Sequence, residues 1–261
     1  KIALLLEFDS FYSKNKPLAD NQGLPSLVFS DQKRERFRNA NTINYDFKEK
    51  IGEDHSLKFF LGEEMIITQN NEVTSEIQGF PSFFDIQTAK NLTTQGTPQS
   101  VDNAYSPDDK LLSFFGRLNY AYKDRYLLTG TFRADGSSKF LGDNQWGYFP
   151  SAAVAWKLKE EDFLKDVDWV NSLKLRFSYG QAGNNNIPSG QQVPTFSSSN
   201  TTYINNVTKY WAVSSVLANP DLKWETTITQ NVGIDFGFFN GVISGSVEAS
   251  KNLPQDLLLN T

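Results

Sequence analysis

The sequence predicts an all-β fold, an antiparallel up-and-down transmembrane β-barrel, with about nine strands in this segment. Apolar and polar residues alternate with a period of two, as in strands that have one apolar and one polar face. The alternating runs reach ~10 residues, which is long for a globular strand but suits a tilted strand that crosses a membrane. Long and short connections also alternate along the chain, as they do in membrane barrels.

The candidate strands follow one another from the first residues to the last. They lie at about residues 2–12, 37–51, 55–69, 112–122, 126–134, 146–158, 172–180, 223–238 and 242–251. In the fourth and fifth runs, Leu118 and Phe132 fall on the apolar face while Arg117 and Arg133 fall on the other. We expect the polar faces to line the barrel interior. Their interior residues include Arg117, Asn119, Arg133, Asp135, Lys174, Arg176 and Asn231.

The connections predict which ends of the strands lie together. Short links are expected at 52–55, 123–125, 159–171 and 240–241, and long links at 13–36, 70–110, 136–145 and 181–222. Strands that run up and down in turn place all long links on one side, as in outer-membrane barrels with outside loops and periplasmic turns. Asn240-Gly241 is a turn pair that tolerates positive φ.

Aromatic residues gather at the ends of these runs. Tyr122 and Tyr126 flank a short link, while Trp146, Tyr148 and Trp224 lie beside long ones. Tyr and Trp at strand ends favour the membrane interface, where the ring is in the apolar boundary and the polar atom in water. A soluble β-sandwich, whose core would hold these aromatics, remains the alternative.

The composition excludes several classes of function. A net charge of −5 and a pI near 5.0 give no basic surface for nucleic acid. The chain has no Cys and a single His, so thiolate chemistry is excluded and a zinc site is implausible. We therefore expect no cofactor and no metal.

Signals for catalysis are weak, and we expect no enzyme. His55 falls in a short link and is expected at the surface. Acidic runs occur at 63–64, 108–109 and 160–162, but adjacent carboxylates on a strand point to opposite faces and do not converge. We expect these acids to be solvated. A β-rich glycoside hydrolase that uses some pair of them stays a rival.

The long link at 181–222 differs in composition from the others. It is rich in Asn, Gln, Ser and Thr, with Tyr203, Tyr210 and Trp211 interleaved. Amide side chains and flat aromatic faces suit sugar recognition, although polar loops often have this composition. These three aromatics are the predicted substrate-binding residues.

Several stretches resemble a known family when taken in order. These are "FRADGSSKFLGDNQWGYFPSAAVAWKLKEEDFL", "LKLRFSYGQAGNNNI", "NPDLKWETTITQNVGIDFGFFNG" and "KNLPQDLLL". From Leu111 to Leu259 the chain resembles the SusC/RagA family of TonB-dependent (TonB-linked) outer-membrane transporters. The segment before Leu111 is compatible with the same family.

The resemblance implies a large barrel of ~22 strands in the bacterial cell outer membrane. It implies import of large nutrients, either glycan oligosaccharides or peptides, with a SusD-like surface lipoprotein as a lid and the TonB complex as the source of energy. Residues 1–261 are then expected to be a portion of the barrel domain, without the plug domain, the TonB-contacting segment and the final strands. The alternative is a soluble secreted all-β carbohydrate-binding module.

Overall fold

The computed structural model describes residues 2–13, 25–47, 50–105, 107–194, 196–197, 212–213 and 217–258. The chain divides into two compact units. The first unit comprises residues 1–38 and 66–109, and the second comprises residues 39–65 and 110–261. Two long strands, β2 (Ser26–Asp46) and β3 (His55–Gln78), contribute residues to both units.

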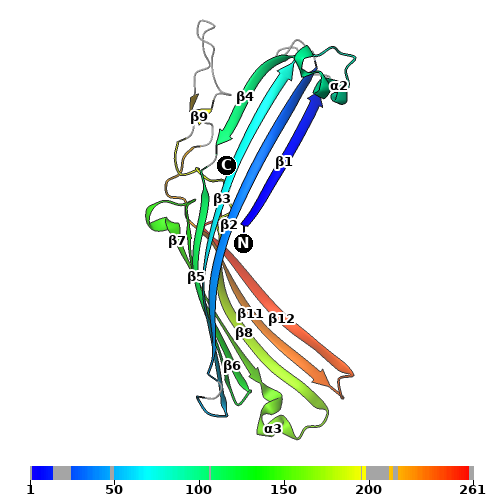
Figure 1. The fold of residues 1–261 in the computed structure, drawn as a ribbon. Helices are drawn as coiled ribbons and strands as arrows, with labels where there is room; N and C mark the ends of the chain where they lie inside the picture. The colour runs from blue at the N-terminus through cyan, green and yellow to red at the C-terminus, as the bar shows by residue number, and fades with distance from the viewer. Residues whose placement is uncertain are drawn as a thin grey trace. The chain divides into compact units, whose positions relative to one another are not determined.

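The first unit is a small antiparallel arrangement with a helical cap. In it β1 (Ile2–Ser13) pairs with β2, and β4 (Thr97–Tyr105) pairs with β3. The helix α2 (Ile86–Asn91) and the 3₁₀ turn η1 (Thr93–Gln95) connect β3 to β4 (Figure 1). Leu27, Phe80, Phe84 and Ala89 form its buried core. Because Phe80 and Leu27 are fully buried, this core holds α2 against the strand ends.

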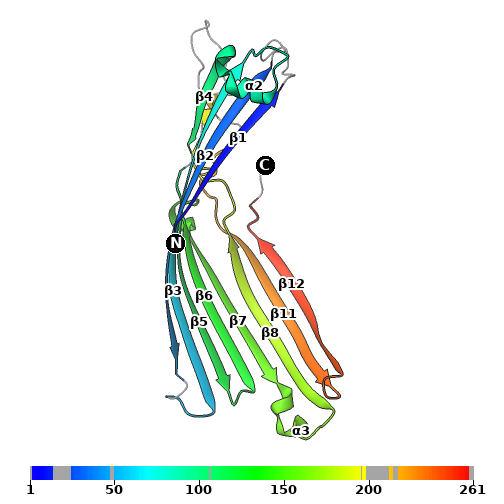
Figure 2. The ribbon, with the colours of Figure 1, turned by 45° about the vertical axis from the view of Figure 1, so that its right-hand side comes forward.

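The second unit is an open antiparallel sheet. Its strands are ordered β2, β3, β5, β6, β7, β8, β11, β12, each beside its neighbour (Figure 2). The later strands are β5 (Asp109–Tyr122), β6 (Tyr126–Ser137), β7 (Trp146–Lys157), β8 (Val170–Asn184), β11 (Glu225–Phe238) and β12 (Ile243–Gln255). Within the described residues β12 pairs with β11 alone.

Short elements occupy the connections of the second unit. They are η2 (Gly142–Gln145), η3 (Leu158–Glu160), α3 (Asp162–Lys165) and the paired β9 (Phe196–Ser197) and β10 (Ala212–Val213). None of the helices found in the described ranges has the length and apolar character needed to cross a membrane.

Each of the nine predicted strands corresponds to an observed strand, but the predicted bounds of β2 and β3 are wrong and one strand was missed. β2 begins at Ser26, β3 continues to Gln78, and the predicted long link at 70–110 contains the additional strand β4. The stretch "TQNNEVTSEIQ" has polar residues on both faces, so it lacks the alternation that indicates a half-buried strand. Pairing with a neighbouring strand, which is not visible in the sequence, makes this stretch a strand.

The predicted tight turns are confirmed. Lys123 and Asp124 have φ of 52° and 53° in the link between β5 and β6. Asn240 and Gly241 have φ of 53° and 83° in the link between β11 and β12. The first link has three residues, 123–125, and the second has four, 239–242, where Phe239 also has a positive φ of 56°. The second turn is therefore longer than the two-residue hairpin that Asn240-Gly241 alone suggests.

Candidate functional site

The sheet of the second unit has two chemically different faces. On the face that we call the apolar face, large hydrophobic side chains are exposed. They include Phe114, Leu118, Leu128, Phe132, Val154, Phe177, Val232 and Ile234. Paired strands place them beside one another, for example Leu128 opposite Val154. A continuous exposed apolar surface of this kind indicates contact with another apolar phase.

The opposite face, the charged face, holds a first ionic cluster around Arg133. Its Nε donates to Asp135 Oδ2 at 2.7 Å and its Nη2 donates to Ser113 Oγ at 2.8 Å. Glu64 Oε2 lies 4.0 Å from the same guanidinium, which also covers the ring of Phe115. The Asp135 side chain is 9% exposed and the Glu64 side chain is 13% exposed. Arg133 therefore neutralises two largely buried negative charges.

A second cluster lies on the charged face where β8, β11 and β12 meet. Asp235 receives hydrogen bonds from Arg176 Nη2 at 2.9 Å and from Ser246 Oγ at 2.8 Å. Lys174 Nζ lies 3.0 Å from the same carboxylate, and Glu248 Oε2 lies 3.4 Å from Arg176 Nη2. Two cations thus share two carboxylates across three strands. The arrangement stabilises strand pairing and leaves a polar wall on this face.

All seven predicted interior residues are on the charged face of the structure. Besides the two clusters, Arg117 Nε donates to Thr131 Oγ1 at 3.3 Å, and Asn119 Oδ1 accepts from Thr129 Oγ1 at 3.0 Å. Asn231 Nδ2 donates to Ser178 Oγ at 3.3 Å. The sequence prediction missed the anionic partners Glu64 and Glu248, because the sequence does not show which residues of neighbouring strands lie opposite one another.

Replacement of Arg133 by methionine is expected to lower the free energy of unfolding by about 2 kcal/mol, because two largely buried carboxylates lose their counter-ion. This expected loss of unfolding free energy is smaller than for a fully buried ion pair, because the Arg133 side chain is 35% exposed. Denaturant unfolding of the full-length protein in detergent measures it. Arg117→Met is the matched control, with one exposed hydrogen bond and an expected loss below about 0.5 kcal/mol. Equal losses for both variants would contradict the ionic cluster.

Aromatic residues fill the end of the sheet where the long links gather. Phe140, Phe149, Ile187 and Trp224 form a buried cluster, and Trp224 Nε1 donates to the carbonyl oxygen of Gln145 at 3.0 Å. The ring centroids of Phe140 and Phe149 each lie 5.4 Å from that of Trp224. The prediction that Trp224 is an interface aromatic is therefore wrong. It precedes β11, and its indole turns into the loop cluster, where burial and the Gln145 bond stabilise it.

Two glycines make room for Phe149. A Cβ atom on Gly147 would lie 2.4 Å from Phe149 Cζ, and one on Gly183 would lie 2.0 Å from the same atom. Both distances are far below van der Waals contact, so a side chain at either position would displace the ring. The small residues on β7 and β8 let a Phe side chain pack on the charged face, below the loops.

At the opposite end, aromatic side chains stack beside the short turns. The rings of Tyr122 and Tyr126 lie 6.3 Å apart, and those of Tyr126 and Trp156 lie 6.2 Å apart. Glu161 joins this group by accepting from Tyr126 Oη at 2.6 Å, Trp156 Nε1 at 2.9 Å and Arg125 Nη1 at 3.2 Å. The expectation of solvated acids in this turn is wrong for Glu161, which is 14% exposed.

The pKa of the Glu161 carboxyl lies below its ordinary value of 4.5, chiefly because Tyr126 donates a hydrogen bond to it, and then because of Trp156 and Arg125. A carboxyl with a depressed folded pKa stabilises the fold above its unfolded pKa and loses this contribution as pH falls through its folded pKa. We expect Glu161→Gln to be less stable than the native protein at pH 7. The difference should narrow as the pH is lowered below about 4.5, in denaturant unfolding at a series of pH values.

Asp162→Asn is the control for this experiment. Its carboxylate is 90% exposed and lies 3.9 Å from Arg125. We expect little change in stability at any pH, since an exposed ion pair contributes little. A Glu161→Gln deficit that stays constant down to pH 3 would rule out the ionised carboxylate as its source.

His55 and the Glu63–Glu64 pair were the residues considered for catalysis. His55 is the first residue of β3 and not part of the short link, and it is half-buried, with Nδ1 2.8 Å from Tyr120 Oη. Glu63 accepts from Asn41 Nδ2 at 3.0 Å, while Glu64 faces Arg133. These neighbours point to opposite faces, as expected, and do not form a catalytic carboxylate pair.

The predicted substrate-binding residues are not among those whose structure is described. Tyr203, Tyr210 and Trp211 all lie in the range 198–211, outside the described residues. Their role therefore stays a prediction. Nearby, Gln192 Nε2 donates to the carbonyl oxygen of Ser138 at 3.0 Å, which links the described start of this connection to the β6–β7 loop.

Comparison with known proteins gives a consistent result. The chain matches the family model "TonB dependent receptor-like, beta-barrel" over residues 6–250. It is 46% identical over 158 residues to TonB-dependent receptor SusC of Bacteroides thetaiotaomicron. The matched segment is 59% of this chain and 16% of that receptor. It is 35% identical over 224 residues to TonB-dependent receptor P26 of Formosa agariphila, and this match covers 86% of this chain and 22% of that receptor.

The fold is also found in solved structures. A chain of the RagAB peptide transporter superposes with a TM-score of 0.80 at 24% identity, covering 100% of this chain and 28% of that chain. The chain thus spans less than a third of the length of each of these relatives. The predicted fold class and the resemblance to SusC and RagA are confirmed, and the relatives are receptors and transporters rather than enzymes, as expected.

Proposed function

Because the chain belongs to the TonB dependent receptor-like β-barrel family, an outer-membrane family, we propose that the full protein imports large nutrients across the bacterial outer membrane. The observation that supports this most strongly is the family match over residues 6–250, on a sheet with one apolar and one charged face. In a barrel the apolar face contacts lipid and the charged face lines the interior.

The proposed solutes are glycan oligosaccharides or peptides. A transporter of the same fold is described as a peptide transporter, and the chain is 46% identical to SusC over part of its length. Tyr203, Tyr210 and Trp211 are the proposed solute contacts, since flat rings interleaved with amide and hydroxyl side chains can stack on and hydrogen-bond a sugar.

The proposed partners are a SusD-like surface lipoprotein and the TonB complex. The lipoprotein would meet the long links, and TonB would act through segments other than those described.

The two rival functions have little support. A soluble carbohydrate-binding module is at odds with membership of an outer-membrane receptor family and with the large exposed side chains of the apolar face. A glycoside hydrolase needs two convergent carboxylates, and the Glu63 and Glu64 side chains diverge.

Uptake in the native organism tests the proposal. Cells that lack the gene for the full-length protein should lose uptake of a labelled oligosaccharide or peptide, and the intact gene should restore it. A protonophore should abolish uptake in the restored strain, because TonB-dependent import is energised. A tagged protein should also co-purify with a SusD-type lipoprotein from detergent-extracted outer membranes. Unchanged uptake of all tested solutes without the gene would refute the import function.

A further inference from the structure

The part of β2 in the first unit carries two neighbouring arginines on one face. Arg34 and Arg36, which we call the arginine pair, are exposed and two residues apart, so they share a face of the strand. Neither has a hydrogen bond or an ion pair with any residue that the structure describes. On the opposite face of β2, by contrast, Lys33 Nζ is paired with Glu35 Oε1 at 3.1 Å. A chain with a net charge of −5 thus has a local site of unpaired positive charge.

The residues directly opposite the arginine pair on β1 are uncharged. In the register of β1 on β2 they are Leu5 and Ala3, and the first acidic residue, Glu7, lies two positions further along β1. On the β3 side, the Glu72 carboxylate accepts a hydrogen bond from Ser30 Oγ at 2.8 Å. Ser30 is four residues before the arginine pair, which is ~13 Å along an extended strand. The arginine pair is therefore available to an anion from outside the chain.

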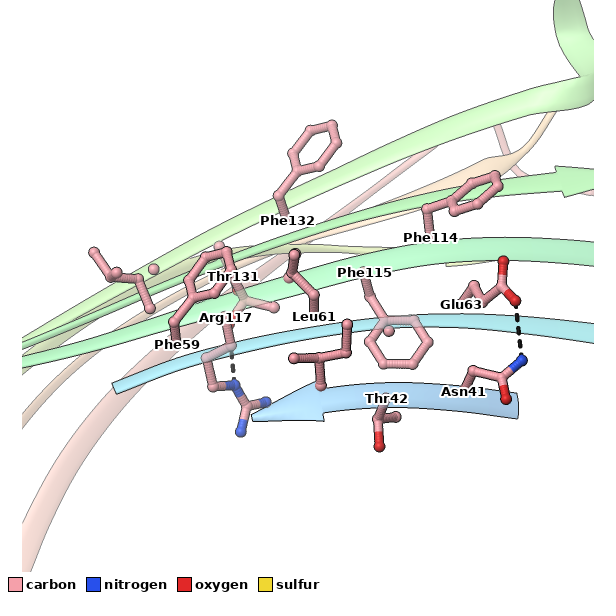
Figure 3. A pocket seen from close by; sticks show the side chains of 16 residues that line it. Asn41, Thr42, Phe59, Leu61, Glu63, Phe114, Phe115, Arg117, Thr131 and Phe132 are labelled. Atoms are coloured by element: carbon pink, nitrogen blue, oxygen red, sulfur yellow. Dashed lines mark hydrogen bonds between the residues drawn. The ribbon is translucent and has the colours of Figure 1, made fainter. Parts of the chain in front are cut away.

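Strand alternation and strand length indicate where the arginine pair lies in a barrel. Six residues separate Arg36 from Thr42, so both are on the same face of β2. In Figure 3, Thr42 points to the same side of the sheet as Arg117, which is on the charged face. A strand crosses the hydrocarbon with ~9–11 residues, whereas β2 has 21 and ends at a short turn. The excess is therefore at its beginning, so the arginine pair is expected at the outer mouth of the barrel interior, where a solute enters.

We propose that the arginine pair binds carboxylate side chains of an extended acidic peptide that enters the barrel. Alternate side chains of an extended chain are ~6.6 Å apart, which is also the spacing of alternate residues on β2. A peptide with an acidic residue at every second position can therefore present one carboxylate to each guanidinium, and each contact can be bidentate. The proposal rests on the import function proposed above and narrows its solutes to acidic peptides.

Fluorescence anisotropy of labelled peptides tests this proposal on the purified full-length protein in detergent. Three peptides of equal length are compared, with repeats of Glu-Thr, of Gln-Thr and of Glu-Glu-Thr-Thr. The last has the charge of the first but no acidic residues spaced by two. We expect the Glu-Thr peptide to bind about tenfold more tightly than either of the others at low salt, because it alone can pair with both guanidinium groups at once. High salt should reduce this difference, since it screens exposed charges.

Single substitutions test whether the arginine pair is the binding site. Arg34→Gln and Arg36→Gln should each weaken binding of the Glu-Thr peptide by about fivefold, the value of one exposed ion pair, and leave binding of the Gln-Thr peptide unchanged. Lys33→Gln is the matched control, because it removes the same charge from the opposite face of β2. It should leave the affinity for both peptides unchanged. Heat-modifiable migration on gels checks that each variant is folded.

Three results would overturn the proposal. The first is equal affinity of the native protein for the Glu-Thr peptide and either of the other two peptides. The second is equal weakening by Lys33→Gln and Arg36→Gln, which would indicate a general effect of net charge. The third is binding of an acidic oligosaccharide, such as an oligogalacturonate, without binding of the acidic peptides. Because binding is measured on purified protein, it can be observed even if gene deletion leaves uptake unchanged. It can also be absent while uptake of neutral solutes requires the gene, so the two proposals can fail separately.

Discussion

Replacing Phe149 with alanine is expected to lower the free energy of unfolding by about 3–5 kcal/mol, the usual cost of deleting a buried phenylalanine. Phe149 is 6% exposed, and its ring contacts Trp224 edge to face. Gly147 and Gly183 leave no side chain that could relax into the vacated space. The lost free energy therefore has two parts, the free energy of moving the ring out of water and the cost of the cavity left beneath the loops.

Denaturant unfolding of the full-length protein in detergent measures this effect. Tyr148→Leu is the matched control, since Tyr148 is the preceding residue, points to the apolar face and is 59% exposed. We expect this control to lower the free energy of unfolding by less than about 1.5 kcal/mol, because it removes only the ring stack of Tyr148 on Phe132. A similar loss for both variants would mean that the cluster beneath the loops does not anchor them.

Replacing Leu118 with lysine is expected to destabilise the barrel by about 2–4 kcal/mol, because a lysine on the lipid-facing side near the middle of the membrane is poorly solvated. Leu118 is 38% exposed on the apolar face and lies inside β5, four residues before the strand ends at Tyr122. The size of the penalty depends on depth, so it reports on where the membrane is.

Asn119→Lys is the control, because Asn119 is the next residue along β5, points to the charged face and accepts an exposed hydrogen bond from the Thr129 hydroxyl. Its expected loss is within about 1 kcal/mol. Folding into lipid vesicles, followed by urea unfolding, measures both variants. If Asn119→Lys were the more harmful, the two faces would be assigned the wrong way round.

Sequence alternation was sufficient to predict the nine strands and their faces. Arg117 and Leu118, or Arg133 and Phe132, are neighbours that must point to opposite sides of a strand, whatever the rest of the chain does. The tight turn at Asn240-Gly241 follows equally from local backbone preference. These properties depend on one or two consecutive residues, so no tertiary information was needed.

Contacts between distant residues were decided by the tertiary structure alone. The pairing that makes β4 a strand, the approach of Glu64 to Arg133 and the burial of Trp224 each require contact between segments far apart in sequence. The same holds for the bonds from Arg125 and Tyr126 to Glu161. A change of register by one residue turns every side chain to the other face, so these contacts cannot be inferred from one strand. Sequence determined which face each residue occupies, and tertiary structure determined which residues meet there.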